Sequence, residues 1–155
     1  MGIDKATLDE LRTIKARTGI RSMLAYLNGL TEHRFTALYR FDDDSLQNVF
    51  FFDRERPEVS SCPTIPIMAS YCVFVKNGKT TFKTCDSHDD ARLNGHSKQM
   101  EVRSYCGVPL IGEDGKMFGT VCHFDYRALP ITDDNVMLME RVAEMLRPDV
   151  GSLAS

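Results

Sequence analysis

The chain has 155 residues, of which 43% are hydrophobic and 26% charged, and its formal net charge is −3. This length suits a single domain with a substantial core, and the composition excludes a disordered chain. The charge balance gives no surplus of basic residues, so we do not expect a nucleic-acid partner. No window approaches the roughly 18 apolar residues of a membrane helix, so we do not expect the chain to bind a membrane.

Five cysteines occur at irregular spacings, which does not fit the disulfide framework of a small secreted domain. The charged N-terminal stretch also lacks the apolar region of a secretory signal. We therefore expect a reduced protein in the cytoplasm. Neither Cys-x-x-Cys nor His-x-x-x-His spacing is present, so the sequence predicts no metal site, and it identifies no cofactor.

Helical patterning opens the chain. Thr7 has capping-box spacing with Glu10, an apolar stripe runs from Leu8 to Leu30, and Gly19 interrupts it. From Arg34 the pattern changes to FTALYRF and LQNVFFFD, which flank an acidic turn and predict an aromatic β-hairpin.

The middle of the chain is less regular. Residues 54–66 contain three prolines and predict a loop, and residues 67–76 fit either a short buried helix or a strand that ends at Gly78. After a short strand in KTTFKT, residues 85–103 form a long polar connection. A connection of this length is uncommon in a compact domain unless it has a function.

The stretch SYCGVPLIGEDGKMFGTVCHFD, residues 104–125, predicts a second hairpin. A last helix follows, with Thr132 as its N-cap and Pro148 at its end. The expected fold is α+β, with one antiparallel sheet that carries the terminal helices on one face and covering loops on the other.

This order of elements resembles the GAF domain family. The resemblance rests on Ser104-Tyr105-Cys106-Gly107-Val108-Pro109-Leu110, on the Asp-Gly turn after it and on Phe118-Gly119-Thr120. It implies one GAF-like domain over residues 1–155, with its core at about 20–147 and a helical extension at 1–19. It also implies a small-molecule ligand between sheet and loops, a homodimer through the terminal helices, a sensory role, and output through a separate protein.

Polar residues and thiols in the strands and the covering segment are the candidates for ligand binding. His123 and Asp125 point the same way from one strand, either as a ligand-orienting pair or as a self-satisfied hydrogen-bonded pair. The candidate residues are Cys72, Asp86, His88, Ser104, Cys106, His123 and Asp125. Cys106 and Cys122 also fit small core residues, because burial of a thiol in a strand makes it a poor nucleophile.

Two alternatives remain open, a redox enzyme and a pure interaction module, and bilin attachment is not favoured. Cys72 and the Asp86-Ser87-His88 stretch resemble parts of the free methionine-R-sulfoxide reductases, a cysteine-dependent redox family, but no cysteine matches the catalytic one expected shortly before the Val-Pro-Leu strand. Cys122-His123 resembles a bilin-attachment pair that lies one strand too late. In a pure interaction module, the run Phe50-Phe51-Phe52 would fill the pocket.

Overall fold

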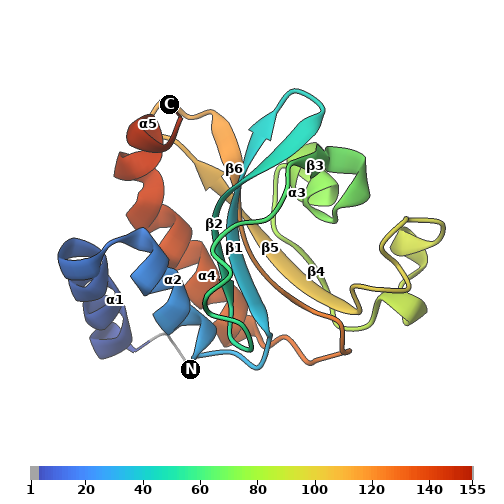
Figure 1. Ribbon diagram of the computed structural model, residues 1–155, viewed down its shortest axis with the longest axis horizontal. Helices are drawn as coiled ribbons and strands as arrows, with labels where there is room; N and C mark the ends of the chain where they lie inside the picture. The colour runs from blue at the N-terminus through green and yellow to red at the C-terminus, as the bar shows by residue number, and fades with distance from the viewer. Residues whose placement is uncertain (1–3, 155) are drawn as a thin grey trace.

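The computed structural model describes residues 4–154 and has three layers (Figure 1). A curled antiparallel sheet lies in the middle, with the long helices on one face and a short helix with irregular segments on the other. The predicted α+β arrangement is therefore confirmed. The strand order is β3-β2-β1-β6-β5-β4. The strands are β1 (Phe35–Asp42), β2 (Ser45–Asp53), β3 (Ile65–Pro66), β4 (Phe82–Thr84), β5 (Ser104–Ile111) and β6 (Met117–Asp125).

Three helices cover one face of the sheet. They are α1 (Lys5–Thr18), α2 (Ile20–Asn28) and α4 (Asp133–Leu146). Gly19 separates α1 from α2 with a φ of 101°, a conformation that side chains with a Cβ rarely adopt. The N-cap of α1 is Asp4, whose carboxylate accepts from the Ala6 N–H, so the helix begins earlier than the Thr7 capping box predicts. Thr132 caps α4 as expected.

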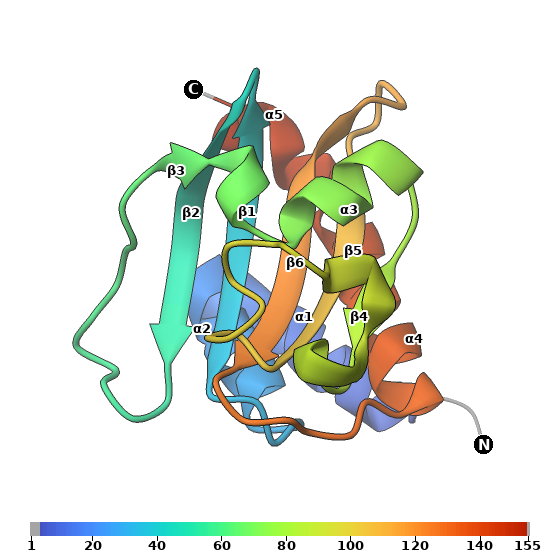
Figure 2. The same ribbon diagram turned by 90° about the vertical axis from the view of Figure 1, so that its right-hand side faces the viewer.

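The other face carries the cover, which we define as residues 62–78 together with 85–103. It contains α3 (Cys72–Gly78) and the short 3-10 turns η1 (Ile67–Ala69), η2 (Ser87–Asp89) and η3 (Ala91–Leu93). The ambiguous segment 67–76 is thus helical rather than a strand, and Figure 2 shows it in front of the sheet. Two small C-terminal elements, η4 (Arg147–Asp149) and α5 (Val150–Leu153), complete the chain.

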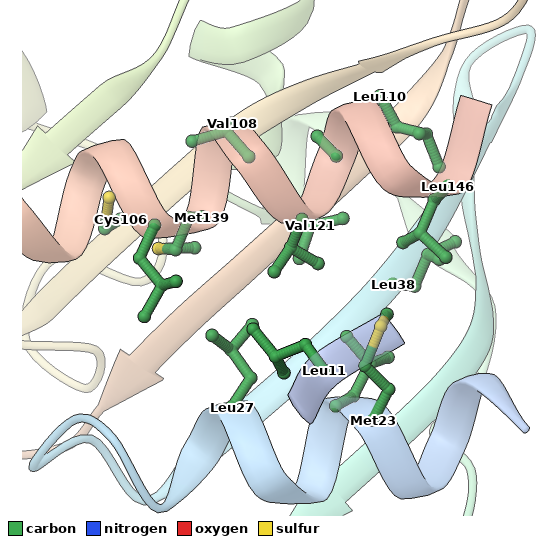
Figure 3. Close-up of a cluster of buried hydrophobic side chains, with 14 residues drawn as sticks. Leu11, Met23, Leu27, Leu38, Cys106, Val108, Leu110, Val121, Met139 and Leu146 are labelled. Carbon is green, nitrogen blue, oxygen red and sulfur yellow. The ribbon is translucent and has the colours of Figure 1, made fainter. Parts of the chain in front are cut away.

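Two apolar clusters hold the layers together, one on each face of the sheet. The helix-side cluster joins Leu11, Leu27 and Met139 to Leu38 and Val121 of the central strands (Figure 3). The cover-side cluster joins strand residues to α3 and η3. Because successive side chains of a strand point to opposite faces, each central strand contributes to both clusters.

Candidate functional site

A cavity of about 310 Å³ lies between the sheet and the cover. Its floor comes from β1, β2, β5 and β6, and its roof from residues 69–71 and 98–102. This size is at the lower end of the range for small-molecule sites, about 300–1,000 Å³. The cover-side face of the sheet thus carries a space of ligand size.

Seven of the sixteen residues that line the cavity are aromatic. Alternate positions of the central strands supply the floor, and Tyr71 supplies the roof. The seven rings are Phe35, Tyr39, Phe51, Tyr71, Tyr105, Phe124 and Tyr126. Phe35 and Phe124 stack on neighbouring strands with centroids 4.8 Å apart, and Tyr71 meets Tyr105 edge-on at 5.6 Å. Such contacts keep the rings in fixed orientations around the space.

Three of the five cysteines lie in or next to the cavity wall. Cys62 and Cys122 line the cavity, and the main-chain N–H of Cys62 donates to Asn48 Oδ1 over 3.3 Å. Cys72, at the start of α3, does not line the cavity and is fully buried. Its sulfur accepts a hydrogen bond from the Tyr105 hydroxyl at 3.1 Å and lies 3.3 Å from Thr120 Oγ1.

Burial and hydrogen bonding act in opposite directions on these thiols. Burial opposes ionisation of Cys72, but hydrogen bonds from Cys122 and from hydroxyl groups outweigh it and lower the pKa of Cys72 below its ordinary value. Burial raises the pKa of Cys122 far above the ordinary value and also raises the pKa of Cys62. The two thiols that face the cavity are thus protonated at neutral pH.

Two direct contacts tie the halves of the cover together. The Tyr71 hydroxyl donates to the Val102 carbonyl over 2.9 Å, and His96 Nε2 lies 3.3 Å from the Ser70 carbonyl oxygen. The segment before α3 is thereby fixed to the loop before β5. Residues of both halves line the cavity.

The structure separates the predicted site residues into three places. Ser104, Cys106, His123 and Asp125 point from β5 and β6 toward the helix side, away from the cavity. Ser104 donates to the Arg127 carbonyl over 2.8 Å, and Cys106 packs in the helix-side cluster, where burial raises its pKa to about 12. Alternation alone could not decide which face is hollow.

Asp86 and His88 lie outside the cavity as well. The Asp86 carboxylate pairs with the Arg103 guanidinium through two hydrogen bonds of 2.9 and 3.0 Å and accepts from the His88 main-chain N–H. Hydrogen bonds from Arg103 lower the pKa of Asp86, and the His88 side chain is exposed. This pair anchors the start of the polar connection to the last residue before β5. Cys72 of the cover does not line the cavity either, but its sulfur contacts the hydroxyl of Tyr105, which does.

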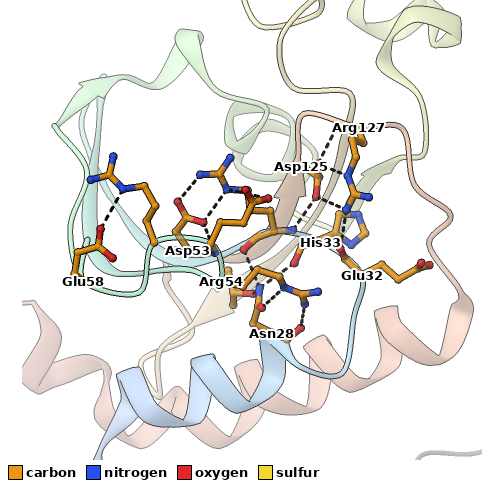
Figure 4. Close-up of polar contacts among 12 residues, drawn as sticks. Asn28, Glu32, His33, Asp53, Arg54, Glu58, Asp125 and Arg127 are labelled. Atoms are coloured by element: carbon orange, nitrogen blue, oxygen red, sulfur yellow. Dashed lines mark hydrogen bonds and ion pairs between the residues drawn. The ribbon is translucent and has the colours of Figure 1, made fainter.

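Asp125 belongs to a polar cluster beside the end of α2 (Figure 4), and His123 is buried as Asp125 is. Asn28 Nδ2 donates to Thr36 Oγ1 over 2.9 Å, and the same hydroxyl oxygen forms a hydrogen bond of 2.7 Å with His123 Nδ1. Asp125 accepts main-chain N–H groups of Arg34 and Arg127, each over 2.8 Å.

The family model for the GAF domain matches residues 11–147. The chain belongs to the GAF domain family. The match covers the sheet, the cover and all but the start of α1. Sequence comparison with curated proteins gives no match. Within residues 4–154, none of the helices combines the length and apolar character needed to cross a membrane, and no three His, Cys, Asp or Glu side chains are grouped to hold a metal ion.

Solved structures with the same fold include both binding domains and reductases. The free methionine-R-sulfoxide reductase from Neisseria meningitidis, in complex with its substrate, has a TM-score of 0.73 at 18% identity and covers 100% of this chain and 96% of its own. The phycocyanobilin-bound GAF domain from a cyanobacterial phytochrome has a TM-score of 0.73 at 15% identity, with 97% of each chain covered.

A third neighbour is the GAF domain from an Acinetobacter phosphoenolpyruvate-protein phosphotransferase, with a TM-score of 0.72 at 13% identity over 98% of this chain and 95% of that one. At these identities the likeness establishes the GAF fold, and the function must be argued from the site of this chain.

Proposed function

We propose that this GAF domain is a sensor that binds a small molecule in the cavity under the cover. The observation that carries the proposal is the space itself, a ligand-sized hollow of about 310 Å³ with aromatic walls and a few polar atoms. The Phe50-Phe51-Phe52 run does not fill it, because Phe51 alone of the three lines the cavity. This favours a binding domain over a module whose pocket is closed by its own side chains.

A bilin, the ligand of one neighbour, fits this chain poorly. The cavity is at the small end of the range for ligand sites, whereas a bilin has four pyrrole rings. The Cys122-His123 pair also gives no attachment site, because Cys122 faces the cavity from a fully buried position while His123 points to the opposite face. We therefore propose a ligand smaller than a tetrapyrrole.

Native mass spectrometry of the purified protein tests the proposal, since a retained ligand adds its mass directly. The variant Ala69→Phe places a ring in the roof of the cavity and should abolish binding, while Met68→Phe changes a neighbouring side chain that is 68% exposed and does not line the cavity. Two results would refute a cavity ligand: equal retention of the ligand by both variants, or no ligand on the unmodified chain or on either variant.

Reduction of a small sulfoxide by cysteine thiols is the second candidate, and the gathering of Cys62, Cys72 and Cys122 supports it. Two observations weigh against it. Cys72, the thiol with the lowered pKa, is fully buried and does not line the cavity, and residues 99–102 contain no cysteine. The test is thiol-dependent reduction of free methionine-R-sulfoxide by the unmodified chain and by Cys72→Ser. Turnover that Cys72→Ser abolishes would establish the reductase.

We also propose a homodimer through the terminal helices and output through a separate protein in the cytoplasm. Tyr26 of α2 and Leu30 just after it are each 38% exposed, and Met137 of α4 is 39% exposed. The helical layer thus exposes apolar side chains that a second copy of the chain would cover in a dimer. Five free thiols, Cys85 among them exposed, suit a reducing compartment. A monomer at high micromolar concentration by analytical ultracentrifugation would exclude the dimer.

A further inference from the structure

The interior of the cavity holds aromatic rings but no charge. Among the sixteen described residues that line it, Lys98 and Glu101 alone carry one. Both belong to the roof loop, with side chains 38% and 55% exposed, and their charged groups pair at 3.3 Å. The two charges therefore lie at the solvent side and satisfy one another.

The polar atoms inside are hydroxyls and thiols in their neutral forms. Burial raises the pKa of Tyr39 and of Tyr105 well above the ordinary value, and it raises the pKa of Cys62 and Cys122 as well. Two of the hydroxyls already have partners, since Tyr105 donates to Cys72 Sγ and Tyr71 to the Val102 carbonyl. The walls thus offer few free hydrogen bonds and no counter-ion.

Another cation lies against two of the wall rings and is also paired already. The Arg34 guanidinium carbon is 4.8 Å from the centroid of the Phe35 ring and 5.9 Å from that of the Tyr126 ring. Its guanidinium makes two hydrogen bonds to the Asp53 carboxylate, at 2.8 and 2.9 Å. An anionic group in the cavity would have to compete with this bidentate pair.

We infer that the cavity selects an uncharged, planar aromatic molecule of one or two fused rings. This inference rests on the proposed function and adds the chemical class of the ligand. A charged group moved into this space would lose its hydration without gaining a partner, which is strongly unfavourable. A flat ring, in contrast, meets the face of one wall ring and the edge of another, as Phe35 with Phe124 and Tyr71 with Tyr105 already do.

Four small probes test the charge and the aromatic character of the ligand. They are indole, its anionic derivative indole-3-acetate, its cationic derivative tryptamine, and cyclohexanol as a neutral aliphatic molecule. NMR chemical-shift titration follows every probe, and because the chain has no Trp, indole fluorescence gives a second reading free of protein indole. Indole should bind at least tenfold more tightly than each of the other three.

Ala69→Phe, with Met68→Phe as its control, tests where indole binds, and Phe124→Leu tests whether the binding depends on an aromatic contact. Ala69→Phe should remove indole binding, while Met68→Phe keeps it. Phe124→Leu retains an apolar wall but loses the ring that stacks on Phe35, so it should weaken indole several-fold and leave cyclohexanol unchanged. Equal losses for both probes would overturn the aromatic preference.

Failure of the ligand class and failure of the binding function give different results. Two results would show that the ligand class is wrong while the cavity still binds a small molecule. In the first, an ionic probe binds as tightly as indole. In the second, indole shows no saturable binding, although the unmodified chain retains a ligand that the Ala69→Phe variant does not. If no ligand is retained and no probe binds, both the class and the proposed function are wrong.

Discussion

The Tyr105 phenol donates a hydrogen bond to Cys72 Sγ, 3.1 Å away, and its hydroxyl lies over Gly107. A Cβ on residue 107 would come within 2.1 Å of the Tyr105 oxygen, far closer than atoms approach. Gly107 thus leaves the space in which Tyr105 connects β5 to α3 under the cavity. The glycine of the Gly-Val-Pro-Leu stretch has a packing reason in this chain.

Gly107→Ala should lower the free energy of unfolding by about 1–3 kcal/mol, the usual cost of overpacking a core. Tyr105 is 3% exposed, so its ring has little room to move aside. Urea unfolding measures the change. Gly151→Ala is the matched control, because its added Cβ meets no atom within 4 Å. Equal stability of the two variants would contradict this account of Gly107.

Leu11 should contribute to stability as strongly as a residue of the sheet. Its side chain is fully buried in the helix-side cluster, although α1 lies in the part of the sequence predicted as an extension. Leu11→Ala should therefore cost about 2–5 kcal/mol of unfolding free energy. Leu30→Ala removes the same atoms from a side chain that is 38% exposed, and it should cost far less. A small effect at Leu11 would mean that the domain does not need α1.

Acid should destabilise the domain through its buried histidines. The His33 and His123 rings stack with centroids 6.0 Å apart, and within the described residues His33 Nε2 has no hydrogen-bond partner. Burial lowers the pKa of His33 to about 4 and that of His123 to about 3. For His33 the nearby Asp125 acts against burial, while Arg54 and Arg127 act with it.

The sign of the pH effect follows from these pKa values. Between pH 6.5 and 4 the unfolded chain protonates its histidines and the folded chain does not, so stability falls as the pH falls. For His33 alone the loss is on the order of 3 kcal/mol over that interval. Urea unfolding at pH 7 and pH 5 measures the part of this loss that falls between those two pH values, roughly 2 kcal/mol for His33, while the carboxylates remain largely ionised. His33→Gln should reduce the pH dependence and His88→Gln, at an exposed position, should not; the same slope in both variants would contradict the assignment.

Thiol labelling should follow exposure, with one ligand-dependent step. Cys85 is exposed and should react first, and Cys62, half-buried in the cavity wall, should react second. Cys72, Cys106 and Cys122 are buried and should react only after unfolding. A bound ligand should slow Cys62 and leave Cys85 unchanged, which mass spectrometry of the labelled peptides can measure. Protection of Cys85 instead of Cys62 would place the ligand elsewhere.

The sequence predicted the fold better than the site, for a physical reason. Strand alternation divides β6 into two faces, with Thr120, Cys122 and Phe124 on one and Val121 and His123 on the other, and this division holds. Which face is hollow depends on how far the cover stands from the sheet, and this distance is set by contacts such as Tyr71 with Val102 that join distant segments. The polar side chains of His123 and Asp125 predicted a ligand site. In the structure His123 bonds to Thr36 instead, and Asp125 accepts from main-chain N–H groups.

The aromatic lining was visible in the sequence but carried no distinguishing signal. Phe35 and Tyr39 alternate along β1 as core residues of any covered sheet do, and only the cavity shows that they face an open space. Asp86 and His88 were misleading for a similar reason. An acidic residue at the start of a polar connection fits a ligand contact, yet Asp86 here pairs with Arg103, seventeen residues later.

The hydroxyl of Tyr71 offers the last test, because it joins the two halves of the cover directly. Tyr71→Phe removes the hydrogen bond to the Val102 carbonyl and keeps the ring in the roof, which should cost about 1 kcal/mol locally. We expect faster hydrogen exchange of the amides in residues 98–102 and faster ligand dissociation, since the roof opens more often. The exchange of β1 and β6 amides should stay unchanged. His88→Ala is the control from the exposed part of the cover. If Tyr71→Phe leaves exchange in residues 98–102 at its original rate, the roof is held by other contacts and the hydroxyl does not set the opening of the cavity.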